Sequence, residues 1–172
     1  MRDVVVDLGP VQLGQFLEAD VDDVHAFASD PEVCRHTTWG PNTMDDTRRF
    51  LHDALVPQQG AWLLAVLREG QVIGTASVWT TSVPDRCGEM GYALGRPFWG
   101  RGYATLVARG LLRLGVDHLR LERISATCSP DNVGSVRVLE KAGLRREGLL
   151  RGHQLVRGAR RDSLVFGVLA TD

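Results

Sequence analysis

The sequence contains few cysteines, which limits the disulfide and metal chemistry that the chain can support. Only three are present among 172 residues, namely Cys34, Cys87 and Cys128. Their odd number and wide spacing argue against a framework of disulfide bonds, and no C-x-x-C pair is present to build a structural zinc site. We therefore expect no metal centre, and reduced thiols that are typical of the cytoplasm.

The sequence also lacks long hydrophobic runs and a strong net charge. No run of about 18 apolar residues is present to form a membrane-spanning helix, and the N-terminus does not have the apolar centre of a signal peptide. The formal net charge is −1, so the overall charge attracts the chain neither to nucleic acid nor to an anionic membrane. We expect a cytoplasmic protein that binds neither, with a homodimer left open as its assembly.

The composition instead favours one folded domain over residues 1–172. Hydrophobic residues make up 44% of the chain, which is enough for a substantial core. The charged residues are unevenly placed, because the first third is acidic and the C-terminal region is rich in arginine. We interpret most of these charges, including the arginines at 157–161, as solvated surface.

Hydrophobic periodicity predicts alternating strands and helices along the chain. Helices are expected at 21–28, from Thr43 to about 55, from 104 onward, and at 133–142, where Gly143 ends the last one. Strands are expected at 11–17, 61–67, 72–79, 86–94, 123–128, 144–156 and 163–169, with a hairpin turn at Gly158. This order predicts an α/β fold of the α+β type, with a mixed, mostly antiparallel sheet of about six to seven strands flanked by about four helices.

A glycine-rich turn at 96–105 separates the expected strand at 86–94 from the following helix. Gly100 and Gly102 have no Cβ, so a ligand can approach the backbone closely. The helix would direct its free N–H groups and positive dipole end at the turn, and Arg101 adds a positive charge, which together favour a phosphate or pyrophosphate. The turn matches neither the P-loop nor the dinucleotide-binding pattern. A connection that needs two glycines only for its geometry is the alternative.

Three stretches of the sequence, spread along the chain, together form a recognisable pattern. The first combines E-M-G-Y-A-L at 89–94 with W-G-R-G-Y-A at 99–104. The second combines P-D-N-V-G-S at 130–135 with V-L-E-K-A-G at 138–143, and the third is G-A-R-R-D at 158–162. In their order and spacing these stretches resemble the GNAT superfamily of acyl-CoA-dependent N-acetyltransferases, in particular the RimJ/RimL branch, which includes ribosomal-protein N-terminal acetyltransferases. The resemblance covers nearly the whole chain.

The resemblance implies a binding site for acetyl-CoA as the acyl donor. Backbone N–H groups at 100–104 would hold the pyrophosphate, with Trp99 at a position where the family usually has Gln or Arg. The strand through Tyr92 would splay from the strand at 124–128, and the pantetheine arm would enter the gap between these two central strands. The implied cofactor-binding residues are Tyr92, Leu94, Trp99, Gly100, Arg101, Gly102, Tyr103, Ala104 and Asn132.

Acyl transfer to an amine needs a neutral amine, a donor for the oxyanion and a proton for the leaving thiolate. Glu89, on the strand before the gap, is the candidate base, because a half-buried carboxylate has a raised pKa. Ser135 is the candidate acid that the resemblance implies, since neither tyrosine lies in this segment, and solvent is the alternative. A sheet-edge charge at Glu89, a surface hydroxyl at Ser135 and an ordinary helix cap at Asn132 are the structural alternatives, and Cys128 is interpreted as lining.

The acceptor site is expected in loops. His36 and Trp39 lie in the loop that covers the acceptor in the family, and His153 lies near the C-terminal hairpin; packing or solvated surface is the alternative for each. We predict an acetyl-CoA-dependent N-acetyltransferase that binds acceptor and donor together, with a protein N-terminus or a small amine as acceptor. The alternatives are a transferase for another acyl group such as succinyl, and a non-catalytic acyl-CoA sensor. A nucleotide-binding protein lacks the Lys-Ser/Thr pair that it would need.

Overall fold

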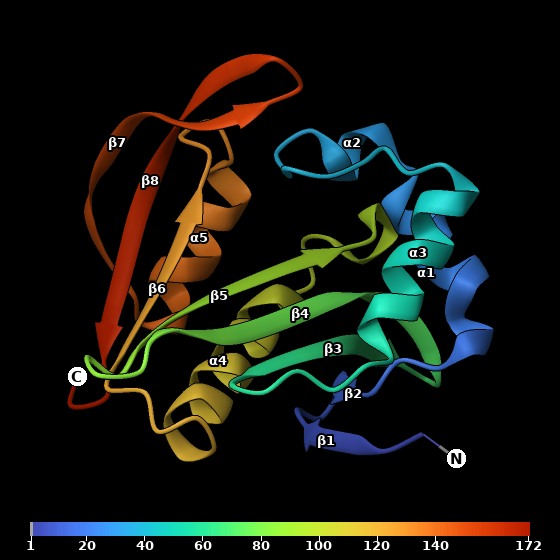
Figure 1. Cartoon of the computed structure of the whole chain (residues 1–172), viewed down its shortest axis with the longest axis horizontal. Coiled ribbons are helices and arrows are strands. Elements are labelled where there is room, and N and C mark those ends of the chain that lie inside the picture. Colours follow the sequence, from blue (N-terminus) through green and yellow to red (C-terminus); the bar gives the residue numbers. More distant parts are fainter. Residues whose placement is uncertain (1) are drawn as a thin grey trace.

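The computed structural model, which describes residues 2–172, consists of one open sheet with helices on both faces (Figure 1). The eight strands are arranged in the order β1-β2-β3-β4-β5-β6-β8-β7. They are β1 (Val4–Asp7), β2 (Gln12–Gly14), β3 (Ala61–Arg68), β4 (Gln71–Ser82), β5 (Cys87–Leu94), β6 (Arg123–Cys128), β7 (Arg145–Val156) and β8 (Ala159–Leu169). The helices are α1 (Val21–Ala28), α2 (Pro31–Cys34), α3 (Met44–Ala54), α4 (Tyr103–Asp117) and α5 (Val133–Ala142), with short 3₁₀ turns η1 (Glu18–Asp20) and η2 (Arg96–Phe98).

The predicted mixed α/β class is confirmed, and local sequence signals placed several helix ends correctly. Thr43 and Asp46 form the predicted capping box of α3, in which the Asp46 N–H donates to Thr43 Oγ1 over 3.2 Å. Gly143 adopts the left-handed backbone conformation, with φ of 106°, and ends α5 as expected. Both signals depend only on residues within one helical turn, which explains why the sequence alone revealed them.

Two strand predictions were wrong in part, and one strand was missed. The predicted strand at 11–17 is only Gln12–Gly14, and it pairs with β1, an edge strand that the sequence analysis missed. β8 begins at Ala159 rather than at residue 163, because Arg160 pairs with Leu155 and Arg161 with Gln154 across the hairpin. These boundaries depend on the partner strand, so periodicity within one segment could not fix them.

The sheet splits between β5 and β6. These two strands are parallel and pair at only three positions, Cys87 with Arg123, Gly88 with Ile124, and Glu89 with Ser125. Beyond Glu89 the strands diverge, which Figure 1 shows as a widening gap above α4. The predicted splay between the two central strands is therefore confirmed, and it leaves the facing edges of both strands without strand partners.

Helices cover the two faces of the sheet separately. The main core joins Val78 and Met90 on the sheet with Val107 and Leu111 of α4, and it continues to Phe166 on β8. A second core lies on the opposite face and is built from side chains of α1, α3 and the sheet: Phe16, Val24, Phe27, Ala28, Leu51, Ala65, Leu67 and Val72. Within residues 2–172, none of the helices has the length and apolarity that a membrane span requires.

Phe166 should contribute strongly to stability, because its side chain is completely buried in the core that joins the two halves of the split sheet. We expect Phe166→Ala to lower the free energy of unfolding by about 3–5 kcal/mol. Leu155→Ala on the neighbouring strand is the control, since that side chain is 66% exposed and should change stability by less than about 0.5 kcal/mol. Denaturant unfolding of both variants measures the difference, and equal losses would contradict this account of the core.

Candidate active site

The glycine-rich turn has the geometry of an anion site. Gly100 and Gly102 have φ values of 73° and 80°, a region that residues with a side chain rarely adopt. A Cβ at either glycine would meet nothing within 4 Å, so the space above the turn is open. Gly102 is the N-cap of α4 and provides no side-chain cap. The first N–H groups of the helix, at Tyr103 and Ala104, therefore face an uncapped end that suits a phosphate.

The side chains around the turn fix its position on the sheet. The Trp99 indole Nε1 donates a hydrogen bond to the Leu94 carbonyl oxygen over 2.7 Å, which ties the turn to the end of β5. Leu94 itself is buried in the core, and the Tyr103 ring stacks with Arg68, whose guanidinium carbon is 5.8 Å from the ring centroid. Arg101 is exposed, and its Nε donates to the Pro97 carbonyl over 3.3 Å. Leu94, Trp99 and Tyr103 thus have structural contacts in addition to their predicted role at the donor site.

Ser135 on α5 lies next to a tyrosine that the sequence analysis did not pair with it. The Tyr92 hydroxyl and Ser135 Oγ are 3.1 Å apart, so the two side chains connect β5 to α5 across the gap. Asn132 caps α5 by accepting a hydrogen bond from the Ser135 N–H over 3.1 Å, which fixes the start of the helix. Burial raises the pKa of Tyr92 to about 12, although the bond to Ser135 opposes this shift. The Tyr92 hydroxyl therefore keeps its proton at neutral pH.

Cys128 belongs to the same group of polar side chains. Burial raises the pKa of its thiol, and a hydrogen bond with Ser135 only partly opposes the shift. A protonated thiol is a weak nucleophile. The arrangement thus supports the interpretation of Cys128 as a lining residue.

Glu89 lies on the opposite face of β5 from Tyr92. It pairs with Trp79 of β4 at the last level where β5 and β6 are still joined. Burial raises the pKa of Glu89, and the nearby charge of His153 lowers it by a smaller amount. The ring of His153 is held by Ser163, with Nδ1 and Oγ 3.1 Å apart, and Ser163 is buried. The structure therefore brings together two predicted site residues, Glu89 and His153, from the two halves of the sheet.

The loop at 35–43 is fastened to the β7–β8 hairpin by Arg157. Its guanidinium donates to the carbonyl oxygens of Cys34, Thr37, Trp39 and Gly40, at distances from 2.6 to 3.4 Å. Arg161 adds a hydrogen bond to the Arg35 carbonyl over 2.8 Å. The prediction that these arginines are merely solvated was therefore wrong for both. Sequence periodicity gave no signal for this clamp, because the partners lie more than 110 residues apart.

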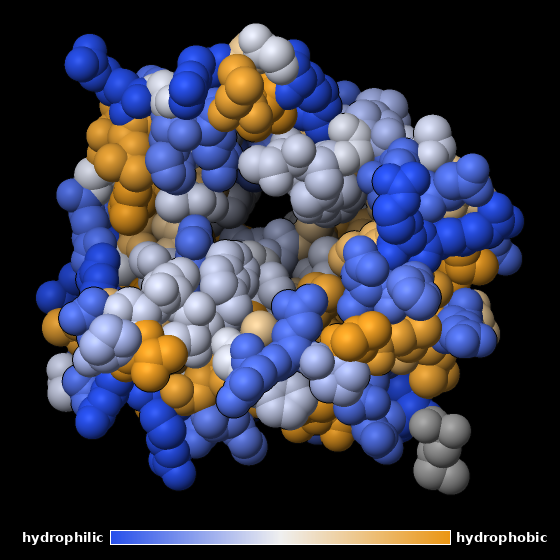
Figure 2. Space-filling view, viewed as in Figure 1, coloured by the Kyte–Doolittle hydropathy of each residue, from blue (hydrophilic) through white to orange (hydrophobic). Residues whose placement is uncertain are grey.

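His36 and Trp39 are carried by this clamped loop. Burial lowers the pKa of His36, as does the nearby Arg35, while the charge of Asp131 at the start of α5 opposes the shift. His36 therefore lies where the loop approaches the other half of the molecule. Figure 2 shows a hollow in the surface between the hairpin, the loop and the sheet. Within residues 2–172, no group of three or more His, Cys, Asp or Glu side chains is placed to hold a metal ion.

Comparison with known proteins shows the family of the chain. The family model described as "Acetyltransferase (GNAT) domain" matches residues 11–145. The chain belongs to the GNAT family. It is 31% identical over 155 residues to p20 of Bacillus licheniformis, an uncharacterized N-acetyltransferase, and the match covers 87% of each protein.

Solved structures of GNAT proteins have the same fold. The acetyltransferase of Bacillus anthracis is 27% identical, with a TM-score of 0.87 and coverage of 100% of both chains. The microcin C7 self-immunity acetyltransferase MccE, solved with acetyl-CoA and AMP, is 18% identical with a TM-score of 0.84, and the match covers 95% of each chain. At that identity the likeness concerns the fold alone. Family and fold together identify this GNAT protein as an acyl-CoA N-acyltransferase.

Arg157 should hold the loop at 35–43 in the conformation described above. We expect Arg157→Ala to increase amide hydrogen exchange at 35–40 by roughly tenfold or more, because the loop loses its hydrogen bonds to the hairpin. Arg160→Ala is the matched control, since Arg160 bonds only to the Gly152 carbonyl of its own hairpin. Exchange mass spectrometry on both variants measures the effect, and unchanged exchange in Arg157→Ala would show that the clamp does not hold the loop.

Proposed function

We propose that the protein is an acetyl-CoA-dependent N-acetyltransferase, acting as a single domain, in which a primary amine attacks the thioester directly while both substrates are bound. One observation carries the proposal. A carboxylate, Glu89, and a hydroxyl pair, Tyr92 with Ser135, lie on opposite faces of β5 beside the point where the sheet splits. A reaction that takes a proton from one substrate and gives one to the other needs such a pair of groups.

The acyl donor would follow the open edge of the sheet. We place its pyrophosphate at the uncapped start of α4, where Gly100 and Gly102 leave room. The pantetheine arm would enter between β5 and β6, where its amide groups can bond to strand edges that have no strand partner beyond Glu89. The thioester would then lie between Glu89 on one side and Ser135 on the other.

The chemistry follows from these positions. The neutral acceptor amine attacks the thioester carbonyl carbon, and Glu89 accepts the proton that the nitrogen then gives up, directly or through water. The oxyanion that forms accepts hydrogen bonds from backbone N–H groups of β5, and the carbon–sulfur bond then breaks. The leaving thiolate takes a proton from Ser135, and Ser135 takes one from Tyr92 through their shared hydrogen bond. Exchange with solvent then removes the proton from Glu89 and returns one to the hydroxyl pair. Coenzyme A and the acetylated amine are the products.

A non-catalytic sensor would need only the donor site. The presence of a base and a proton donor at the split favours the enzyme. Membership of the RimJ/RimL branch and the preference for acetyl over a longer acyl group stay predictions.

The dependence of the rate on pH tests the role of Glu89. Only the carboxylate form can accept a proton, and burial raises the pKa of Glu89 above its ordinary value of 4.5. The acceptor amine must also lose its proton, at a pKa of about 7.7 or higher. We expect log kcat/KM for the acceptor, plotted against pH, to rise with a slope of about two below the pKa of Glu89. Between the pKa of Glu89 and that of the amine, the slope should be about one.

The assay measures thiol release from acetyl-CoA with a chromogenic disulfide. Glu89→Gln should lower kcat by roughly 100-fold and leave a slope of about one throughout, because only the amine then titrates. His153→Gln is the comparison, since His153 is the neighbouring base. If the part of the profile with a slope of about two disappears in His153→Gln and persists in Glu89→Gln, the base is His153 rather than Glu89. Absence of thiol release with every amine would contradict the proposed function.

The hydroxyl pair should act as one unit. We expect Ser135→Ala and Tyr92→Phe each to lower kcat, by roughly 100-fold for Ser135→Ala, since a positioned acid contributes at least this much. The double variant should lose little more than Ser135→Ala alone, because both changes interrupt the same proton path. Steady-state kcat values of the unaltered protein, the two single variants and the double variant give the coupling between Tyr92 and Ser135. Additive losses would show that Tyr92 and Ser135 act independently.

A further inference from the structure

We propose that the acceptor is a small primary amine with a flat apolar or aromatic body, rather than a protein N-terminus. This inference rests on the proposed function, because it assigns the acceptor for the same reaction. Its basis is a pocket that lies on the same face of the sheet as Glu89 and is bounded by the loop at 35–43. Three separate observations support it: the pocket itself, the strand register that places it on the same face as Glu89, and the hydrogen bonds of Arg157 to the loop at 35–43.

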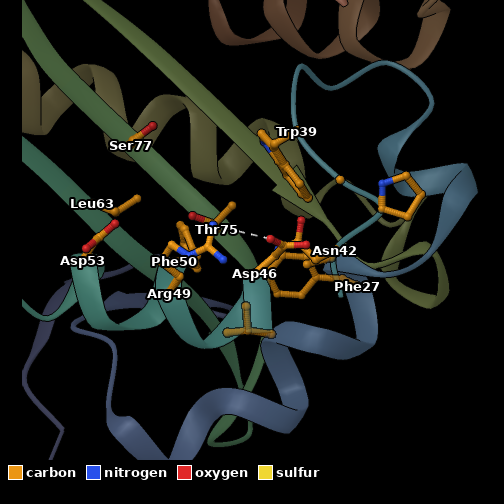
Figure 3. A pocket seen from close by; sticks show the side chains of 14 residues that line it. Phe27, Trp39, Asn42, Asp46, Arg49, Phe50, Asp53, Leu63, Thr75 and Ser77 are labelled. Carbon is orange, nitrogen blue, oxygen red and sulfur yellow. Dashed lines mark ion pairs between the residues drawn. The ribbon is translucent and has the colours of Figure 1, made fainter. Parts of the chain in front are cut away.

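The pocket lies between α1, α3 and the sheet and has a volume of about 750 Å³, within the range of small-molecule sites. Figure 3 shows Phe27, Trp39 and Phe50 around it, with Thr75 and Ser77 reaching it from β4. Phe27 is buried in the second core, so the partly exposed rings of Trp39 and Phe50 are the ones that can contact an occupant. They favour a flat apolar group, since stacking and edge contacts with rings are favourable. The hydroxyls of Thr75 and Ser77 leave a few hydrogen-bonding positions to orient that group.

The acidic side chains at the rim do not make this a site for a second cation. The Asp46 carboxylate already accepts hydrogen bonds from Thr43 and lies 3.7 Å from the Arg49 guanidinium. These bonds to Thr43 lower the pKa of Asp46, so its negative charge is engaged by the protein itself. The positive charge of Arg49 offsets it within the same wall. Asp53, the other carboxylate in the lining, is exposed to solvent. We therefore expect the apolar body of the occupant, rather than an additional charge, to determine selection.

The strand register connects this pocket to Glu89. Ser77 pairs with Gly91 and Trp79 pairs with Glu89, and directly paired residues point to the same face of a sheet. Ser77 and Glu89 thus share one face, and their levels are about 7 Å apart along the strands at 3.4 Å per residue. An amine on a short linker can span this distance. A body held in the pocket would then present its amino group to Glu89.

Gly91 leaves open the space between the pocket and Glu89. Its φ lies outside the positive region, and a Cβ would meet only Ser77 Oγ at 3.7 Å and the Trp79 ring at 4.0 Å, which are ordinary contacts. Neither the backbone nor the packing therefore requires glycine here, although glycine weakens a strand. A glycine without a structural cause inside a strand indicates that a ligand approaches closely. A larger side chain at 91 would lie between the pocket and Glu89.

The hydrogen bonds between Arg157 and the loop at 35–43 restrict what can enter the pocket. Trp39 and Gly40 form part of the pocket wall, and Arg157 binds the carbonyl oxygens of both. This rim of the pocket cannot move away from the hairpin without breaking those bonds. An extended peptide advances by about 3.3–3.6 Å per residue, so only its first residues could contact the walls of a pocket of about 750 Å³. A compact amine can place its whole body against these walls, which is why we favour it over a protein N-terminus.

The first experiment compares acceptors in the thiol-release assay. 2-Phenylethylamine, n-butylamine, methylamine and hexapeptides with free N-termini serve as probes, with acetyl-CoA as donor. We expect kcat/KM for 2-phenylethylamine to exceed that for n-butylamine and for the peptides by about tenfold or more. Calorimetric titration of 2-phenylethylamine into the protein loaded with coenzyme A measures acceptor binding without turnover.

Two substitutions test the pocket and the path. Trp39→Ala and Gly91→Val should each lower kcat/KM for 2-phenylethylamine by about tenfold, while kcat/KM for methylamine changes by less than about threefold. Trp39→Phe should restore most of the loss, because it keeps a flat apolar wall. Gly148→Val is the matched control for Gly91→Val, since a Cβ at Gly148 would meet nothing within 4 Å and its φ is also not positive.

The outcomes separate this inference from the proposed function. Turnover of peptides without binding of 2-phenylethylamine would overturn the inference and leave the acetyltransferase in place. Absence of turnover with every amine, while acetyl-CoA still binds, would overturn the proposed function. Calorimetric titration of 2-phenylethylamine would then show whether the pocket binds such an amine. Binding of 2-phenylethylamine that is lost in Trp39→Ala would support the pocket, and absence of binding to the unaltered protein would refute it.

Discussion

The short pairing between β5 and β6 is the constraint on which the rest of the structure depends. Three residue pairs join the strands, and beyond Glu89 each strand edge has backbone groups without a strand partner. Backbone N–H and carbonyl groups need hydrogen bonds, so the open edges are suited to a ligand that can supply amides. The two halves stay together because the main core under α4 continues from β4 to β8, and because Tyr92 and Ser135 bridge β5 and α5.

Alternation along β5 separates the two proton-transfer tasks. Glu89 and Gly91 face α1 and α3, whereas Met90 belongs to the core beneath α4 and Tyr92 reaches Ser135 on α5. An acceptor would thus approach from one side of the sheet and the thiolate would leave on the other. The same burial that raises the pKa of Glu89 raises that of Tyr92. A carboxylate with a raised pKa binds a proton more tightly, and a hydroxyl with a raised pKa stays protonated at neutral pH.

The features that sequence reasoning predicted well are those set by neighbouring residues. The glycine turn, the Thr43–Asp46 capping box and the strand around Tyr92 each follow from local chemistry or from a short motif. The contacts that define the site are of another kind, because Tyr92 and Ser135 are 43 residues apart and Arg157 and Trp39 are 118 apart. β1 escaped prediction for a related reason, since an edge strand of four residues is defined by its pairing with β2.

The clamp at Arg157 has an evolutionary consequence. Its guanidinium recognises only main-chain oxygens, at Cys34, Thr37, Trp39 and Gly40. Every amino acid provides the same carbonyl group, so the side chains of the loop can diverge while its path across the molecule is retained. Trp39, which forms a wall of the pocket, can therefore be exchanged for another residue without dismantling the scaffold. The side chains of this loop can therefore vary without any change at the glycine turn that begins α4.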